Sequence, residues 1–463
     1  MSTEFPNSEV KLRRVLTLSD LVIYGIILIQ PVAALPLFGH ANNISQGHAT
    51  TTIVIAMLAM IFTAISYGRM ANKYPAAGSA YTYVGKGLST HLGFIAGWCM
   101  FLDYLIVPII CTIYCSITAH HLIPFIPYIV WIVFFITNFT ILNLNGIKVT
   151  SRTNWVLMII MSVVVFYFMA AALRYILVKN GFGGLFTIQP FYHEDSFSWN
   201  AIWSGTALAA LTYIGFDGIT TLSEEVENPR RNVLLATVLT CVITGIWSGA
   251  QVYLAQASWP DWMSFTQGLT DQAARNNALD TAIISVARRV GGGYLDSILT
   301  VVLLVASVGS GVTAQVGAAR LLYGMGRDKV LPNKFFAHLD KKHAGPSYNV
   351  MFIGVLALFG ALIFNYEECA RLINFGAFLA FIGVNAASIR EYFFHAKEKT
   401  MKGFLLNFLP STFGAVFCFI LWKSLPWKTF AIGGSWMIVG IIYLAIKTNG
   451  FRKKPEMIGF SEM

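Results

Sequence analysis

Hydrophobic residues in this chain gather into long runs that short polar stretches separate. A membrane-spanning helix needs about 20 predominantly apolar residues. Twelve runs approach this length, and we number them in chain order. They are Leu18–Ala41, Thr52–Met70, Leu92–His120, Ile126–Leu144, Asn154–Leu177, Trp199–Leu222, Val233–Ala257, Leu295–Tyr323, Val350–Phe364, Ala370–Ile389, Phe404–Trp422 and Phe430–Ile446. The pattern predicts an all-α integral membrane protein, with residues 1–463 forming one polytopic domain and polar tails at 1–17 and 447–463.

Composition supports the membrane assignment and excludes an ordinary soluble domain. Only 12% of the residues are charged, 56% are hydrophobic, and the mean hydropathy is +0.64. Soluble domains carry about a quarter charged residues. The six cysteines lie in or beside apolar runs without a C-x-x-C pair, so we expect buried, reduced thiols rather than a metal centre.

The distribution of basic residues predicts the orientation of the chain. With twelve alternating spans, about three quarters of the 32 lysines and arginines fall on the side that holds both termini. The positive-inside rule places that side in the cytoplasm. The same bias accounts for the formal net charge of +10, so we do not expect nucleic acid as a partner.

The sixth run carries an acid within its hydrophobic sequence. Asp217 stands in Gly215-Phe216-Asp217-Gly218, where two glycines weaken the helix. Charged groups at membrane depth are costly and usually functional, and broken membrane helices usually line a site. A kinked helix with a paired structural acid is the alternative. The first run is interrupted from Gly25 to Pro31, five spans earlier, which indicates two five-helix repeats of inverted topology.

Three motifs resemble the amino acid–polyamine–organocation superfamily of transporters. They are Tyr74-Pro75-Ala76-Ala77-Gly78-Ser79-Ala80-Tyr81-Thr82-Tyr83, the Gly215–Gly218 break with its extension to Asn232, and Ala319-Arg320-Leu321-Leu322-Tyr323-Gly324-Met325-Gly326-Arg327-Asp328. Within the superfamily, Leu102-Asp103-Tyr104-Leu105 and Thr220–Glu225 look most like bacterial putrescine importers. The resemblance implies a leucine-transporter-like five-plus-five fold with discontinuous helices one and six. It also implies a substrate site between them, a location in the bacterial inner membrane, and a monomer or homodimer.

One departure from the family bears on the substrate. Amino acid permeases typically hold the substrate carboxylate on glycine-rich amides in the break of helix one, whereas Ile29-Gln30-Pro31 stand here. Proline has no N–H, and the other two residues lack the conformational freedom of glycine. A carboxylate cradle is therefore not expected, unless the Gln30 side-chain amide replaces it. Gly25 and Ile26 are the other predicted contacts on helix one.

Two acids, Asp103 and Asp217, are the predicted substrate ligands. Each can hold one ammonium group of a diamine through charge-assisted hydrogen bonds. The neighbouring aromatic residues can add cation–π contacts, and packing against the protein core or lipid is the alternative role for each. With Gly215, these aromatic neighbours complete the predicted site: Trp98, Tyr104, Tyr213 and Phe216.

For coupling we expect a proton, carried by Asp217 or Asp103, because an acid withdrawn from water binds a proton more readily. Sodium at Ser307 and Ser310 is the alternative. No cofactor or metal is expected, and His120-His121 have no carboxylate or cysteine nearby in the sequence.

The charged run after the sixth span suggests an inner gate. Glu224, Glu225 and Arg230 are the candidate gate residues, within a cluster of salt bridges at a cytoplasmic helix end.

The sequence therefore predicts a secondary transporter that imports putrescine or a related polyamine by proton symport. An amino acid permease or antiporter of the same superfamily is the alternative. A membrane-embedded enzyme is disfavoured because no nucleophile–base pair or metal cluster stands out. A channel is disfavoured because the sequence has no repeated pore motif.

Overall fold

The computed structural model describes residues 14–75, 79–145, 151–223, 225–327, 331–340, 345–395 and 400–453. Throughout this part the chain is helical, and its one β-type contact is an isolated parallel bridge between Leu16 and Val226. The principal helices are α1 (Leu18–Ile29), α2 (Phe38–Ile44), α3 (Ala49–Lys73), α4 (Ser79–Gly87), α5 (Thr90–Leu122), α6 (Tyr128–Leu144), α7 (Ser151–Asn180), α8 (Trp199–Ala209), α9 (Pro229–Ser258), α10 (Gln272–Asp280), α11 (Ala282–Arg327), α12 (Asn333–Phe336), α13 (Ser347–Ile363), α14 (Tyr366–Ile389), α15 (Met401–Gly403), α16 (Leu409–Lys423) and α17 (Trp427–Lys447).

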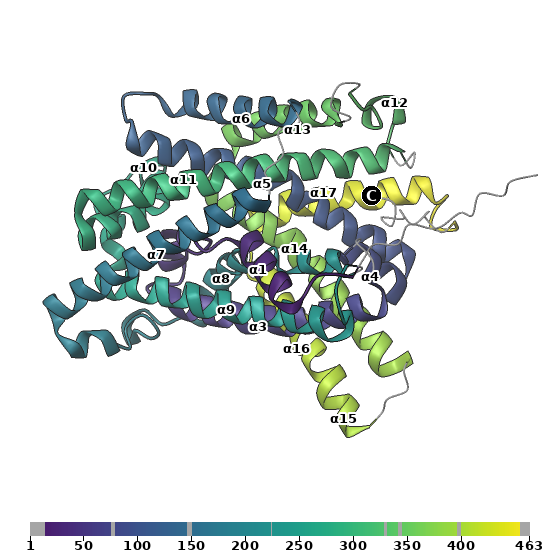
Figure 1. Ribbon diagram of the computed structural model, residues 1–463, viewed down its shortest axis with the longest axis horizontal. Coiled ribbons are helices and arrows are strands. Elements are labelled where there is room, and N and C mark those ends of the chain that lie inside the picture. The colour runs from purple at the N-terminus through teal and green to yellow at the C-terminus, as the bar shows by residue number, and fades with distance from the viewer. Residues whose placement is uncertain are drawn as a thin grey trace, which may run out of the picture.

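Eight helical segments are long and apolar enough to cross a membrane. They comprise α3, α5, α7 from Trp155, α9, α11, α14 with its extension to His395, the stretch from α15 through α16, and α17. Three shorter apolar helices, α1, α6 and α13, join them. Most of these helices run along one common direction, as Figure 1 shows. Each of the twelve predicted runs coincides with one or more helices, although length and composition alone identify eight as spans.

The two interrupted runs form their helices differently from the prediction. In the first, α1 ends at Ile29, so Gly25 is still helical and the irregular segment extends from Gln30 to Leu37. In the sixth, α8 ends at Ala209, before the predicted break, and two 3₁₀ turns, η3 (Ala210–Tyr213) and η4 (Phe216–Leu222), replace the α-helix. Both breaks exist, but the first lies later in the chain than predicted, and the second is longer than its glycine positions suggested.

The helix that contains the eighth predicted run is longer than the run itself. Helix α11 extends from Ala282 to Arg327, and Gly292 interrupts it with a φ of 72°, which a residue bearing a side chain rarely adopts. The kink lies within the Gly291-Gly292-Gly293 sequence. Apolar counting placed the start of this span at Leu295 because the preceding turns are mixed in polarity.

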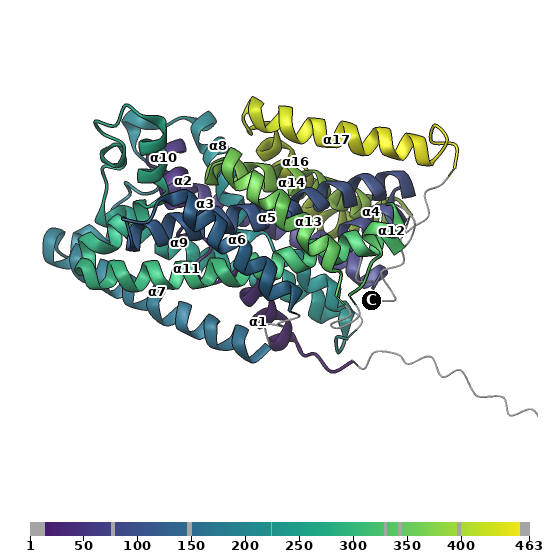
Figure 2. The same ribbon diagram turned by 90° about the horizontal axis from the view of Figure 1, so that it is seen from above.

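The core is a set of helices that pack around the two breaks. Helix α3 packs along α9, and α5 packs against both α11 and α14. Helix α1 and the turn η4 contact each other and α9. Figure 2 shows α17 lying along one edge of the bundle, where it contacts α5 and α14. The six cysteines are free and buried, as expected from the sequence.

Candidate substrate site at the two helix breaks

The break in helix one is anchored to α11 through Gln30. Its backbone has a φ of 71°, in the left-handed region. Its side-chain Nε2 donates hydrogen bonds to Ser310 Oγ at 2.7 Å and to the Ala306 carbonyl at 3.3 Å. The amide that could have replaced a glycine cradle is therefore engaged with α11.

Helix α9 secures the other side of the same break. The carbonyl of Pro31 accepts hydrogen bonds from Trp247 Nε1 at 2.9 Å and from Gln251 Nε2 at 3.1 Å. Because a carbonyl freed from a helix must find another partner, these two donors stabilise the irregular segment. Sequence analysis missed both residues. The available signal was Gln251, a polar residue within the apolar run Val233–Ala257.

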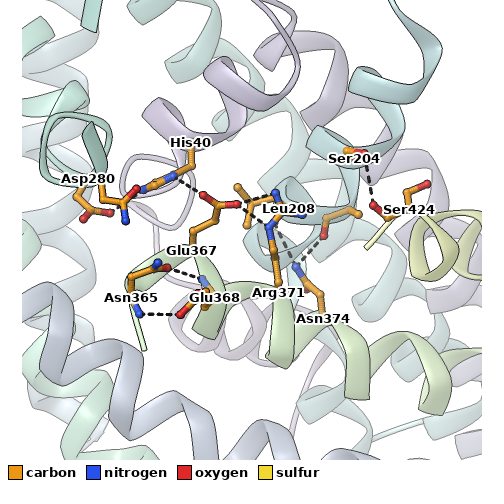
Figure 3. Close-up of polar contacts among 12 residues, drawn as sticks. His40, Ser204, Leu208, Asp280, Asn365, Glu367, Glu368, Arg371, Asn374 and Ser424 are labelled. Carbon is orange, nitrogen blue, oxygen red and sulfur yellow. Dashed lines mark hydrogen bonds and ion pairs between the residues drawn. The ribbon is translucent and has the colours of Figure 1, made fainter. Parts of the chain in front are cut away.

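Helix six bends at Gly215, whose φ of 120° requires glycine. The α8 carbonyls that lose their helical partners before this point are covered by α14. Asn374 Nδ2 donates to the Ala207 carbonyl at 2.7 Å and to the Leu208 carbonyl at 3.3 Å, as Figure 3 shows. Tyr213 donates its hydroxyl to the Ile53 carbonyl of α3 at 2.8 Å. The Asn374 amide thus replaces backbone bonds at the end of α8, and the Tyr213 hydroxyl attaches the bend to α3.

Asp217 lies in η4 with 9% of its surface exposed. The backbone amides of its own turn surround the carboxylate, and Ser79 of α4 approaches it. The hydroxyls of Tyr67 and Tyr83 also lie within electrostatic reach. The hydroxyl oxygens of Ser79, Tyr67 and Tyr83 are buried. They face polar neighbours, since Ser79 lies toward Asp217, Tyr67 toward Ser79 and Tyr83 toward Thr220. Three hydroxyl groups therefore gather beside a buried carboxylate.

Asp103 of α5 and Asp217 are close enough for their charges to interact. Tyr104 interacts electrostatically with both acids and with Tyr24 of α1. Tyr104 keeps 41% of its surface exposed, and Asp103 is partly exposed. The structure thus brings together the two predicted acids and adds Tyr24, which the sequence analysis did not select.

The other predicted aromatic contacts have packing roles. Phe216 is fully buried, with its ring edge-on to Tyr67 at a centroid distance of 5.4 Å. Trp98 lies between α5 and α17 instead of beside the acids. Its indole stacks on Trp436 at 4.7 Å, and each of the two indole N–H groups donates to the backbone carbonyl of the other tryptophan.

On helix one, Gly25 is a close-packing position. A Cβ there would lie 2.6 Å from Ile219 Cδ1 and 2.7 Å from Thr240 Oγ1, so α1, η4 and α9 meet at this glycine. Ile26 accepts the backbone N–H of Gln30 at 2.9 Å, and Ile29 is buried beside the break. These residues support the site through packing and backbone contacts. Ser307 of α11 is half-buried.

At the end of α1 that carries the chain's N-terminal segment, the predicted gate residues form backbone contacts. The Glu225 carbonyl accepts the N–H groups of Val15 and Leu16, at 2.9 and 3.0 Å. Among the described residues no ion pair joins Glu225 to Arg230. Glu224 lies outside the described residues. Glu225 therefore contacts the chain before α1 through its backbone carbonyl.

The expectation that His121 has no carboxylate neighbour was wrong. His121 Nε2 lies 3.1 Å from Asp296 Oδ1 of α11, a residue distant in the sequence. The contact joins the end of α5 to α11 shortly after its kink at Gly292. Within the part of the chain that the structure describes, no group of three histidine, cysteine or acidic side chains is arranged to hold a metal ion.

Comparisons with known proteins relate the chain to a family of permeases. The amino acid permease family model matches residues 15–446. The chain is 34% identical over 450 residues to the low-affinity putrescine importer PlaP of Escherichia coli strain K12, covering 96% of each chain. It is 26% identical to the branched-chain amino acid permease BcaP of Bacillus subtilis, covering 94% of this chain and 93% of the relative. It is also 26% identical to the methylthioribose transporter of B. subtilis, covering 93% and 92%.

Together these matches identify the function class. The family match extends from the segment before α1 to the end of α17 and includes both helix breaks. The relatives are named as importers, permeases and transporters, not as enzymes. The chain is a multi-pass membrane transporter and belongs to the amino acid permease family.

Proposed function

We propose that this transporter imports putrescine or a related polyamine across the bacterial plasma membrane by alternating access. In this proposal the chain crosses the membrane twelve times with both termini in the cytoplasm. Helices one to ten form two inverted five-helix repeats, and the site lies at the breaks of helices one and six. The observation that carries the proposal is the pairing of Asp103 and Asp217 beside these breaks. The similarity to a putrescine importer agrees with it.

A diamine satisfies this pair of acids better than a neutral amino acid does. Two carboxylates in a poorly solvated site repel each other, and a dication removes that repulsion while it provides one ammonium group for each acid. The hydroxyl oxygens of Tyr67, Tyr83 and Ser79 have lone pairs that can accept hydrogen bonds from an ammonium group near Asp217. Tyr24 and Tyr104 can add cation–π contacts worth roughly 0.5 to 2 kcal/mol each.

The helix-one break supports the same substrate class. The Gln30 amide donates to α11, and Pro31 provides a carbonyl without an N–H. At these two positions the chain therefore presents no donor for a carboxylate of the kind that a glycine-rich loop presents. An amino acid permease is the second candidate, favoured by the 26% identity to a branched-chain amino acid permease. An amino acid permease would have to bind the carboxylate of its substrate through other residues.

For coupling we propose a proton, with Asp217 or Asp103 as its carrier. A carboxylic acid that loses water contacts gains proton affinity, and these are the two acids of the site. A sodium site at Ser307 and Ser310 has less support because Ser310 Oγ already accepts a hydrogen bond from Gln30.

Uptake by the purified, reconstituted protein tests the substrate assignment. Labelled putrescine is offered to proteoliposomes with and without an imposed proton gradient, in competition with spermidine or with neutral amino acids. We expect uptake that depends on the gradient and is blocked by polyamines. Inhibition by neutral amino acids alone would refute the polyamine assignment. Gradient-independent uptake would refute proton coupling.

The variant Asp217→Asn tests the site itself. A charge-assisted hydrogen bond contributes about 1.5 to 3 kcal/mol, so putrescine affinity should fall about 10- to 150-fold. Asp261→Asn is a matched control because this acid is exposed in the loop between α9 and α10. Binding to purified protein is measured by calorimetry. Equal affinities for Asp217→Asn and the unsubstituted protein would exclude an ammonium contact there.

A further inference from the structure

A buried histidine lies between two carboxylates at the end of the molecule opposite the Leu16–Val226 bridge. His40 of α2 is 1% exposed. Its Nε2 lies 2.8 Å from Asp280 Oδ1 of α10, and its Nδ1 lies 3.1 Å from Glu367 Oε2 of α14. Figure 3 shows the ring bridging the two acids. In the proposed topology this is the outer end of the transporter.

This geometry requires the charged form of the histidine. A neutral imidazole carries one N–H, so its other nitrogen would present a lone pair to a carboxylate. The imidazolium donates to both acids. Arg371 completes the charge balance, since its Nη2 and Nε both lie 2.7 Å from Glu367 Oε1. Two cations then match two anions, and the loss of one proton would leave an uncompensated buried charge.

The cluster joins three elements that are separate in the sequence. Helix α2 continues helix one beyond its break, α10 lies in the loop between α9 and α11, and α14 bears Asn374, which covers the helix-six break. The contact between α2 and α10 is also close at the backbone. A Cβ on Gly39 would lie 2.1 Å from the Leu279 carbonyl oxygen and 2.7 Å from Ala282 Cβ. The ion cluster therefore fastens α10 across the outer part of helix one.

The remaining titratable groups around this cluster do not compete for the same role. Near Asp280 and His40 they are tyrosines: Tyr366 of α14, Tyr114 of α5 and Tyr128 of α6. The helices α8 and η5 (Trp262–Phe265), which also pack on α2, contain no titratable residue. At this end of α3 and α11 stand His48, Arg288 and Arg289. His48 contacts the Ser45 carbonyl and the His193 N–H, so as a neutral ring it satisfies both contacts.

We propose that His40 makes closure of the outer entrance depend on a proton. As the imidazolium it ties α2 to α10 and α14 and holds the entrance closed. When it loses the proton, α10 separates from helix one and the entrance opens. This inference rests on the proposed transport function for its topology, but it concerns a gate distinct from the substrate acids.

Distance measurements between spin labels test the gate without substrate. Ala273 of α10 and Trp427 of α17 are exposed, and the six native cysteines are buried, so cysteines introduced at 273 and 427 can be labelled selectively. The distance distribution is recorded in lipid nanodiscs from about pH 6 to about pH 10, a range wide enough to include release of a proton that two carboxylates hold. We expect one dominant distance at low pH and a second, longer distance at high pH. An identical distribution at both pH values would overturn the proposal.

Two variants separate the charge of His40 from its packing. In His40→Gln the side chain can donate to only one of the acids at a time through its amide and has no titratable charge, so the distances should no longer change with pH. The control is His48→Gln, another buried histidine at this end of the molecule whose contacts are backbone groups, and here the pH response should persist. A pH response retained in folded His40→Gln would contradict the proposal.

If His40→Gln does not fold, Asp280→Asn provides the same test, because it removes one carboxylate while the histidine remains. The equilibrium should then shift toward the longer distance already at low pH. An unchanged distribution would contradict the proposal. The outcome is independent of the substrate assignment, since failure of putrescine uptake would leave the distance measurement valid.

Discussion

Asn374 provides a direct test of how the break in helix six is stabilised. It is fully buried, and its amide donates to two carbonyls that have left the α-helical pattern. The variant Asn374→Leu keeps a similar volume and removes both donors. The 2.7 Å contact to Ala207 should dominate the cost, because a buried carbonyl left unpaired costs about 1 to 3 kcal/mol. The 3.3 Å contact to Leu208 adds less, since this carbonyl also accepts the Ala210 N–H.

Leucine also removes the buried Asn374 Oδ1, which has no hydrogen-bond partner in the described part of the chain, and this offsets part of the cost. We therefore expect Asn374→Leu to lower the free energy of unfolding by about 1 to 2 kcal/mol. Thermal unfolding in detergent is followed with a thiol-reactive fluorescent dye, which the six buried cysteines make possible. The midpoint should fall by a few degrees. Asn138→Leu is the matched control, because Asn138 donates at 2.8 Å to the Phe134 carbonyl within its own helix at an exposed position. Equal midpoints for the two variants would refute the idea that α14 supports the break.

Two further predictions concern the substrate site. Asp103→Asn should weaken the binding of putrescine more than that of a monoamine of similar length, because only the diamine has a second ammonium group for this acid; calorimetric titration measures both. Equal losses for the two amines would argue against that contact. Trp98→Ala should destabilise the protein, since it removes the stacking on Trp436 and the hydrogen bond from the Trp98 indole to the Trp436 carbonyl, but it should leave the Kd for putrescine unchanged. A large rise in Kd with an unchanged unfolding midpoint would show that Trp98 contacts the substrate, as the sequence predicted.

The His40 cluster and the two breaks illustrate different limits of sequence reasoning. Asp280 and Glu367 are far from His40 in the sequence, and each alone resembles an ordinary loop or helix-end acid. Hydrophobic periodicity indicates that a segment is buried but carries no information on which distant segment contacts it. For this reason the sequence analysis left His40 unmentioned, although its contacts are among the clearest in the structure.

The hydrophobic pattern by itself determined that this chain is a helical membrane protein, because burial in lipid requires long apolar helices. It also located the acids Asp103 and Asp217, since charges at membrane depth stand out against apolar neighbours. Only the tertiary structure decided which groups complete the site. Tyr24 lies near the acids, Trp98 packs against α17 instead, and the Gln30 side chain donates hydrogen bonds to α11. The break in helix six is also longer than its glycines suggested, because side chains of other helices donate to carbonyls that an isolated helix would have satisfied itself. Asn374 donates to the Ala207 and Leu208 carbonyls, and Gln251 donates in the same way to the Pro31 carbonyl of helix one.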